Sequence, residues 1–270
     1  MPTVVGVMLR KIKDKIYADV RRFNLSLNDE IILVTDHGVE AGVVCEREKN
    51  IPKSKDPVGK VLRKAMDEDK RRVADNERKA LKAHEIVAQK ADDHGLDMKV
   101  TCVYYTFDCS KLFVYYTSET RVDFRELIKD LGHILKTRIQ MVQIGVRDES
   151  KMIGGVGTCG QILCCQGFLK DFNSVTIDMA KEQDLLSNTA KLSGLCGRLM
   201  CCISYENDTY KTVKKDLPEI GTIIATPEGK AKLTAIDCIR ERVTVDFGDR
   251  IFKNFTIKQI NDNNHKESGR

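Results

Sequence analysis

The nine residues GTCGQILCC at 157–165 are almost repeated as GLCGRLMCC at 194–202. Each copy has one leading cysteine followed five residues later by an adjacent pair, namely Cys159, Cys164 and Cys165, then Cys196, Cys201 and Cys202. A unit of nine residues is too short to be a solenoid repeat. The explanation for the duplication is therefore to be sought in sulfur chemistry.

The setting of these cysteines favours metal ligation over disulfide bonds. The N-terminal residues lack the apolar core and cleavage site of a signal peptide, and no apolar run is long enough to span a bilayer. We therefore expect a cytoplasmic protein without membrane insertion, in a compartment where thiols stay reduced. Six of the ten cysteines fall in two windows of seven residues, which predicts a thiolate-ligated metal centre.

The spacing within each copy bears on which metal is bound. Adjacent side chains on a helix or strand point in different directions, so both members of a Cys-Cys pair cannot easily reach one zinc ion. The simplest full site takes the leading cysteine and one member of the pair from each copy, giving four thiolates around a [4Fe–4S] cluster or a zinc ion. The cysteine left over in each copy is either buried filler or part of a second cluster completed by another chain.

We predict an iron–sulfur cluster, with zinc as the alternative. A cubane is larger than a single ion and accepts ligands from loops of unusual spacing, and common zinc ribbons use C-x2-C pairs instead. Gly160 and Gly197, directly after the leading cysteines, allow backbone N–H groups to approach sulfur. No histidine or other general base is adjacent to the thiols, so we predict no catalytic residue.

The remainder of the chain predicts an α+β fold, with small β-barrel-like modules flanking a strand–strand–helix–strand core and a long charged amphipathic helix. We divide it into a β module at 1–50, the helix at 56–95, the α+β core with the cysteine block at 98–215, a second β module at 216–260 and a disordered tail at 261–270.

The helix is predicted from Met66, Val73, Ala80 and Val87, which recur every seven residues, with Leu62 and Leu81 adding width. The polar companion positions Asp69, Asn76 and His84 interrupt this seam and argue against a stable coiled coil. Hairpins are predicted around turns at 36–38 and 108–110, and the helix of the core is predicted from apolar residues at helical spacing, namely Phe124, Leu127, Ile128, Leu131 and Leu135. Residues 145–151 are predicted to form a surface loop with salt bridges.

Composition limits the functional classes. The net charge of +5 permits contact with nucleic acid without requiring it. The four cysteines outside the repeat, Cys45, Cys102, Cys109 and Cys238, are predicted to be small apolar fillers.

Several segments together carry a family resemblance: RVDFRELIKDLG at 121–132, RIQMVQIGVRDESKMIGGVGTCGQILCC at 138–165 and SGLCGRLMCC at 193–202. With them, the chain resembles the bacterial YaaT/RicT family, whose members share a polymerase-suppressor-type C-terminal domain. The resemblance implies that the six repeat cysteines are cluster ligands. One departure is Gln161, where the family commonly has an arginine matching Arg198.

The resemblance also implies a regulator and not an enzyme. Members of the family form a complex with two small helical proteins, which is associated with mRNA maturation by ribonuclease Y and with sporulation, competence and biofilm formation. Our hypothesis is a cytoplasmic adaptor with an iron–sulfur centre that binds these partners and influences RNA processing. The alternative is a metal- or redox-dependent nucleic-acid-binding protein that contacts RNA directly.

Overall fold

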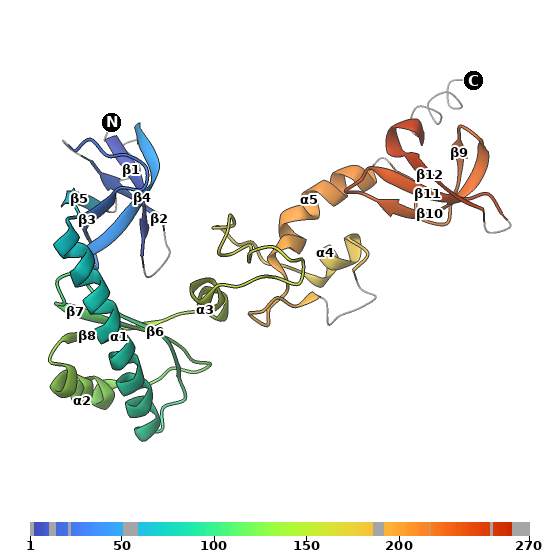
Figure 1. Ribbon diagram of the computed structural model, residues 1–270. Coiled ribbons are helices and arrows are strands. Elements are labelled where there is room, and N and C mark those ends of the chain that lie inside the picture. The colour runs from blue at the N-terminus through green and yellow to red at the C-terminus, as the bar shows by residue number, and fades with distance from the viewer. Residues whose placement is uncertain are drawn as a thin grey trace. The chain divides into compact units, whose positions relative to one another are not determined.

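The computed structural model describes residues 3–10, 15–20, 23–50, 59–185, 192–215, 217–248 and 251–260. This part combines a closed barrel, two further sheets and several helices, which confirms the predicted α+β class (Figure 1). The predicted tail at 261–270 lies outside the described residues. The described part contains no helix that is long and apolar enough to cross a membrane.

The chain divides into two compact units. The N-terminal unit comprises Met1–Val156 and Gly160–Gln166, and the C-terminal unit comprises Gly157–Cys159 and Gly167–Arg270. The first cysteine loop therefore contributes residues to both units. Each unit is described by itself.

The N-terminal unit begins with a five-stranded closed barrel in the order β1-β2-β5-β3-β4. Its strands are β1 (Thr3–Leu9), β2 (Lys15–Asp19), β3 (Glu30–Thr35), β4 (Gly38–Asn50) and β5 (Gly59–Lys64). Inward-facing side chains such as Val7, Leu33 and Val44 are fully buried and form the barrel core. The predicted turn at residues 36–38 connects β3 to β4, which pair as an antiparallel hairpin.

The start of the long helix was predicted wrongly. Residues 59–64 form strand β5, and the helix α1 begins only at Asp67 and ends at Asp93. Gly59 and Val61 are buried while Lys60 and Leu62 are exposed, so this segment follows the two-residue period of a strand. β5 pairs in parallel with β2 and antiparallel with β3, and closes the barrel.

The buried face of α1 includes Ala80 and Val87 of the predicted seven-residue seam, but not Met66 or Val73. Met66 and Leu81 are 61% and 70% exposed. The buried positions on the helix are Asp69, Asn76, Ala80, Ala83, Val87 and Ala91. Two polar residues thus occupy the core-facing side, where the sequence pattern had suggested interruptions of the seam.

Asn76 is the polar residue that fixes α1 to the neighbouring hairpin. Its Nδ2 donates to the carbonyl oxygens of Thr106 and Phe107 at 3.3 and 3.1 Å, and the Cys109 thiol donates to its Oδ1 at 3.0 Å. Cys109 has a φ of 60°, and this hydrogen bond helps to hold the turn in that conformation. Asn76 therefore gives the Phe107 carbonyl a partner and is a second donor to the Thr106 carbonyl, which also accepts from the Cys109 N–H at 2.9 Å.

Replacing Asn76 with alanine is expected to lower the free energy of unfolding by about 2–3 kcal/mol, because the Phe107 carbonyl and the Cys109 thiol lose their partner and the Thr106 carbonyl loses one of its two donors. Urea denaturation followed by far-UV circular dichroism measures this. Asp75→Ala is the matched control, since that side chain is 52% exposed on the same helix. It should change the free energy of unfolding by less than about 0.5 kcal/mol. Equal effects of the two substitutions would contradict the role given to Asn76.

The rest of the N-terminal unit is a three-stranded sheet, order β6-β7-β8, with helices packed on it. Its elements are β6 (Lys99–Tyr105), β7 (Lys111–Thr117), α2 (Arg125–Leu135), β8 (Arg138–Gln143) and α3 (Val146–Ile153). This is the strand–strand–helix–strand order expected from sequence. α1 and α2 share a core with one sheet face, through side chains such as Val87, Leu112 and Leu131. Residues 145–151 were predicted as a loop, but α3 shows that most of them are helical.

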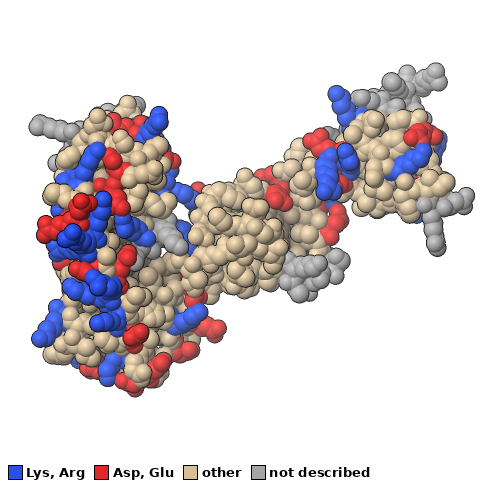
Figure 2. Space-filling view, in the orientation of Figure 1, with Lys and Arg blue, Asp and Glu red and all other residues tan. Residues whose placement is uncertain are grey.

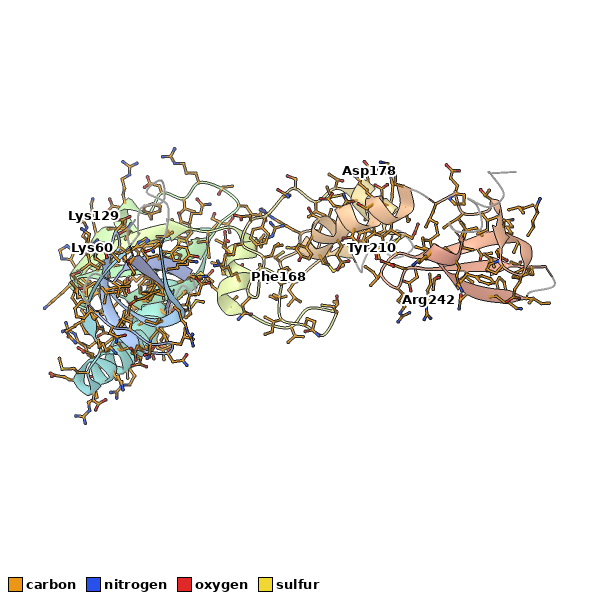
Figure 3. All side chains as sticks on the ribbon, turned by 90° about the horizontal axis from the view of Figure 1, so that it is seen from above. Lys60, Lys129, Phe168, Asp178, Tyr210 and Arg242 are labelled. Atoms are coloured by element: carbon orange, nitrogen blue, oxygen red, sulfur yellow. The ribbon has the colours of Figure 1, made fainter. Side chains whose placement is uncertain are left out.

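The C-terminal unit contains a helix pair and a four-stranded antiparallel sheet. The helices are α4 (Ile177–Glu182) and α5 (Cys201–Lys215), and the sheet has β9 (Ile223–Thr226), β10 (Gly229–Asp237), β11 (Arg242–Asp246) and β12 (Phe252–Thr256) in the order β12-β11-β10-β9. Figure 3 labels Asp178 on α4, Tyr210 on α5 and Arg242 on β11. Ala180 of α4 and Ile203 of α5 are buried in one small core beneath the second cysteine loop.

Candidate metal centre

The duplicated sequence is also a duplicated local structure. We define the first cysteine loop as residues 156–165 and the second as residues 193–202. Each is closed by an isolated antiparallel bridge, Val156 with Ile162 in the first and Ser193 with Leu199 in the second. Gly160 and Gly197 have φ values of 80° and 74°, so the glycines after the leading cysteines adopt the conformation expected from sequence.

Backbone hydrogen bonds repeat with the same offset. The Leu163 N–H donates to the Gly155 carbonyl at 3.2 Å, and the Met200 N–H donates to the Leu192 carbonyl at 2.9 Å. One turn later, the N–H of Gln166 donates to Leu163, and that of Ile203 donates to Met200. Because all these positions differ by 37 residues, the two loops are equivalent knuckles and not merely similar strings of letters.

The two loops differ in what supports them. The second leads directly into α5, and Ile203 is 1% exposed in the core with Ala180 and Leu192. At the equivalent position the first loop has Gln166, whose Oε1 accepts from the Gly155 N–H at 3.3 Å. The first loop is therefore held by the side-chain amide of Gln166, whereas the second is held by the apolar core around Ile203.

Gly154 provides the space for that amide. It ends α3 with φ 82° and ψ −177°, and an added Cβ would lie 2.9 Å from the amide of Gln166. Gly154→Ala is therefore expected to cost about 1–3 kcal/mol of local stability, through backbone strain and loss of the Gln166 contact. Hydrogen exchange at the Leu163 amide should accelerate accordingly.

Gly132→Ala is the matched control for that substitution. Gly132 lies within α2 and nothing would meet its Cβ within 4 Å, so alanine should stabilise the helix by about 0.4–1 kcal/mol. Unchanged exchange at Leu163 in Gly154→Ala would show that Gln166 does not hold the first loop.

The six repeat cysteines are divided between the two units. Cys164 and Cys165 belong to the N-terminal unit, and Cys159 belongs to the C-terminal unit with the whole second loop. Cys159 is exposed, Cys165 is 9% exposed, and the remaining four are half-buried. None of them forms a disulfide bond. Within the described residues, no three His, Cys, Asp or Glu side chains are grouped around one position that could hold a metal ion.

The donor chemistry nevertheless fits a thiolate-bound cofactor. Six reduced thiols lie on or beside two equivalent glycine-containing loops, and soft thiolates are the ligands that iron–sulfur clusters use. Cys201 and Cys202 are the first two residues of α5, whose first turn has no acidic side chain. The N-terminal end of a helix carries partial positive charge, which suits bound thiolates.

Two contacts join the copies within the C-terminal unit. The Thr158 hydroxyl lies 4.0 Å from Sδ of Met200, which places the neighbour of Cys159 beside the neighbour of Cys201. Farther along, the rings of Phe168 and Tyr205 meet edge to face, with centroids 5.0 Å apart. The sequence analysis did not single out these four residues, although the offset of 37 relates Phe168 to Tyr205.

Charged side chains are rare around the loops. Residues 154–169 contain no Lys, Arg, Asp or Glu, and Arg198 is the one charged residue at 192–205. Figure 2 shows lysine, arginine and carboxylate side chains crowded over α1 and sparse over the cysteine segment. Exposed apolar residues occur there instead, with Ile162 and Leu195 at 62% and 64% exposure.

The other four cysteines have different surroundings. Cys238 is 3% exposed, as expected of a filler, and burial raises the pKa of its thiol. Cys45 is exposed, so its prediction as a buried filler was wrong: the alternation of β4 turns Val44 inward and Cys45 outward.

Sequence reasoning also missed a buried carboxyl group. Glu40 on β4 is 9% exposed, and its Oε1 has no hydrogen-bond partner among the described residues. Burial raises the pKa of this carboxyl to about 7, with the nearby Tyr104 hydroxyl opposing the shift. Glu40 lines a small cleft of the N-terminal unit with Arg10 and Asn76. The residue could not be recognised from sequence, because a glutamate within a strand is ordinarily exposed.

Two segments of the chain match known protein families. The model of the PSP1 C-terminal conserved region matches residues 59–144, and that of the third domain of PSP1-like proteins matches residues 174–217. These matches cover the sheet of the N-terminal unit and the helix pair that carries the second cysteine loop, and they define a PSP1-type protein.

A relative that matches nearly the whole chain identifies the family more closely. The chain is 46% identical over 252 residues to stage 0 sporulation protein YaaT of Bacillus subtilis strain 168, covering 93% of this chain and 92% of that protein. The chain belongs to the YaaT/RicT family. It is also 33% identical over 85 residues to the uncharacterized protein PB7E8.02 of Schizosaccharomyces pombe, covering 32% of this chain and 11% of that one. No solved structure matches the chain.

Proposed function

We propose that this protein is a non-enzymatic regulatory adaptor of the cytoplasm whose six repeat cysteines hold an iron–sulfur cluster. The observation that carries the proposal is the pair of equivalent cysteine loops, because the same backbone hydrogen bonds present the same three thiols twice. The regulatory role is supported by near full-length similarity to a protein named for stage 0 of sporulation.

The chain's own residues have defined parts in this proposal. Gly160 and Gly197 turn the backbone after each leading cysteine, and Cys201 and Cys202 lie at the positive end of the α5 dipole. The exposed apolar side chains beside the loops suit protein contact more than nucleic acid, which would require basic side chains. When bound, an iron–sulfur cluster supplies a redox-active or structural centre whose presence can be sensed by partners.

The partners proposed are those of the family: two small helical proteins of the same complex and, through them, ribonuclease Y. The adaptor would influence mRNA maturation and thereby developmental regulation such as sporulation. Direct contact with RNA is not part of the proposal.

Anaerobic purification of the full chain tests the proposal. We expect a brown protein absorbing near ~400 nm, with iron and acid-labile sulfide bound, as thiolate-ligated clusters give. Iron and sulfide are then counted with and without the two small partner proteins. Zinc in place of iron would overturn the cluster assignment. A steeply salt-dependent affinity of the protein alone for RNA would favour the nucleic-acid-binding alternative.

A further inference from the structure

The contact between Phe168 and Tyr205 joins equivalent positions of the two copies. Phe168 lies three residues after Cys165, and Tyr205 lies three residues after Cys202. Their rings are 5.0 Å apart at 68°, an edge-to-face geometry that aromatic pairs prefer. The contact therefore joins corresponding positions of the repeat, both of which lie in the C-terminal unit.

The pair is also notable for its exposure. Phe168 is 59% and Tyr205 60% exposed, so neither ring is anchored in a hydrophobic core. Packing of the C-terminal unit therefore gives little reason for the two rings to stay together. Their mutual contact and the Thr158–Met200 contact both connect residues of the first copy's sequence with the second copy within this unit.

In the sequence, Thr158 and Phe168 flank the three cysteines of the first loop. Thr158 directly precedes Cys159, and Phe168 follows the Cys-Cys pair. On the second copy, Met200 directly precedes Cys201, while Tyr205 projects from the first turns of α5. Of the two contacts, the hydroxyl–thioether one is long and weak, so the aromatic pair is the stronger constraint.

We propose that Phe168 and Tyr205 form an aromatic clamp within the C-terminal unit that holds the segment after the first cysteine loop on α5 and keeps Cys159 close to the second cysteine loop. Both are positioning residues, which act on the ligands and do not themselves bind iron. The inference rests on the proposed iron–sulfur function and assigns to it two residues outside the cysteine motif.

The test compares iron content in full-length variants purified anaerobically. Phe168→Ala and Tyr205→Ala are each expected to lower iron and sulfide per chain by about threefold or more and to weaken the absorbance near ~400 nm. Phe168→Tyr and Tyr205→Phe should retain the wild-type values, since an edge-to-face pair is preserved. Phe252→Ala is the matched control, because Phe252 is 57% exposed on the sheet of the same unit.

A second measurement does not require the cluster. The two alanine variants and the double variant are unfolded with urea as apoproteins. If the two rings contact mainly each other, the double substitution should lower the urea midpoint of unfolding no further than either single substitution. Additive midpoints would overturn the clamp. Iron content at the wild-type level in Phe168→Ala would also overturn the clamp. This holds even if that variant no longer binds the partner proteins.

Failure of the clamp and failure of the proposed function give different results. Wild-type protein without iron or sulfide would refute the iron–sulfur function, and the unfolding cycle would still decide whether the rings clamp the repeat. Wild-type protein with a cluster that survives both alanine substitutions would refute the clamp alone.

Discussion

Cys196→Ser is expected to abolish the iron–sulfur chromophore and to reduce iron affinity by more than about tenfold, since even outer-shell substitutions cost that much at metal sites. Cys196 is the leading thiol of the second loop, set by the Ser193–Leu199 bridge and by Gly197 at φ 74°. Serine keeps the size of the side chain but replaces a soft thiolate with a hard oxygen. Iron and sulfide per chain, together with absorbance near ~400 nm, measure the loss.

Cys45→Ser is the control for this prediction. Cys45 is an exposed thiol on the barrel strand β4, outside the repeat. Its replacement should leave iron content and stability unchanged. Full iron content in Cys196→Ser, or loss of the chromophore in Cys45→Ser, would show that the wrong thiols had been assigned.

The same variant connects the centre with the adaptor role. If the cluster organises the surface that partners contact, Cys196→Ser should also lose binding to the two small partner proteins. Retained binding by the iron-free variant would separate the partner surface from the metal centre and remove the link that the proposed function makes between them.

The sequence pattern was sufficient for elements whose burial follows a simple period. Alternating apolar residues indicated both hairpins, and Leu127 and Leu131 on one face indicated the helix over 125–135. The glycine after each leading cysteine indicated the turn that both loops adopt. In these cases local preference and burial agree.

The pattern failed where tertiary contacts decide the structure. Gly59 and Val61 enter the barrel core because β5 closes it between β2 and β3, a pairing with distant residues that no local period reveals. Asn76 was interpreted as an interruption of an apolar seam, but its partners Thr106 and Phe107 lie thirty residues farther along the chain. The Phe168–Tyr205 contact needed the fold as well, because the repeat offset relates the two residues without bringing them together.

Glu40→Gln is expected to stabilise the protein at neutral and alkaline pH. In the folded state the pKa of Glu40 is raised from 4.5 to about 7, with burial as the main cause. The groups that face it are the Tyr104 hydroxyl, the Asp108 carboxylate and the Lys111 ammonium, with Arg10 and Glu77 also lining the cleft. None of these forms a hydrogen bond to its Oε1, so the ionised form remains poorly compensated.

The sign of the pH dependence follows from linkage. Below pH 4.5 the carboxyl is protonated in both states and has no effect on the free energy of unfolding. Between 4.5 and about 7 the unfolded chain releases the proton while the folded one keeps it, so stability falls as pH rises. Above about 7 both states are ionised, and a constant penalty of roughly 3 kcal/mol remains.

Urea denaturation from pH 4.5 to 8.5, followed by tyrosine fluorescence, measures this. The chain has no tryptophan, and five of its seven tyrosines lie at residues 17–116, so the signal reports mainly on the N-terminal unit. Glu40→Gln should nearly match the wild type at pH 4.5 and gain about 3 kcal/mol at pH 8. Glu46→Gln on the same strand is the control of opposite sign, because Lys15 and Lys49 lower the pKa of that carboxyl and its stabilisation is lost in acid. A Glu40→Gln gain that is equal at both ends of the range would mean that packing of the amide, and not removal of a buried charge, produces the effect.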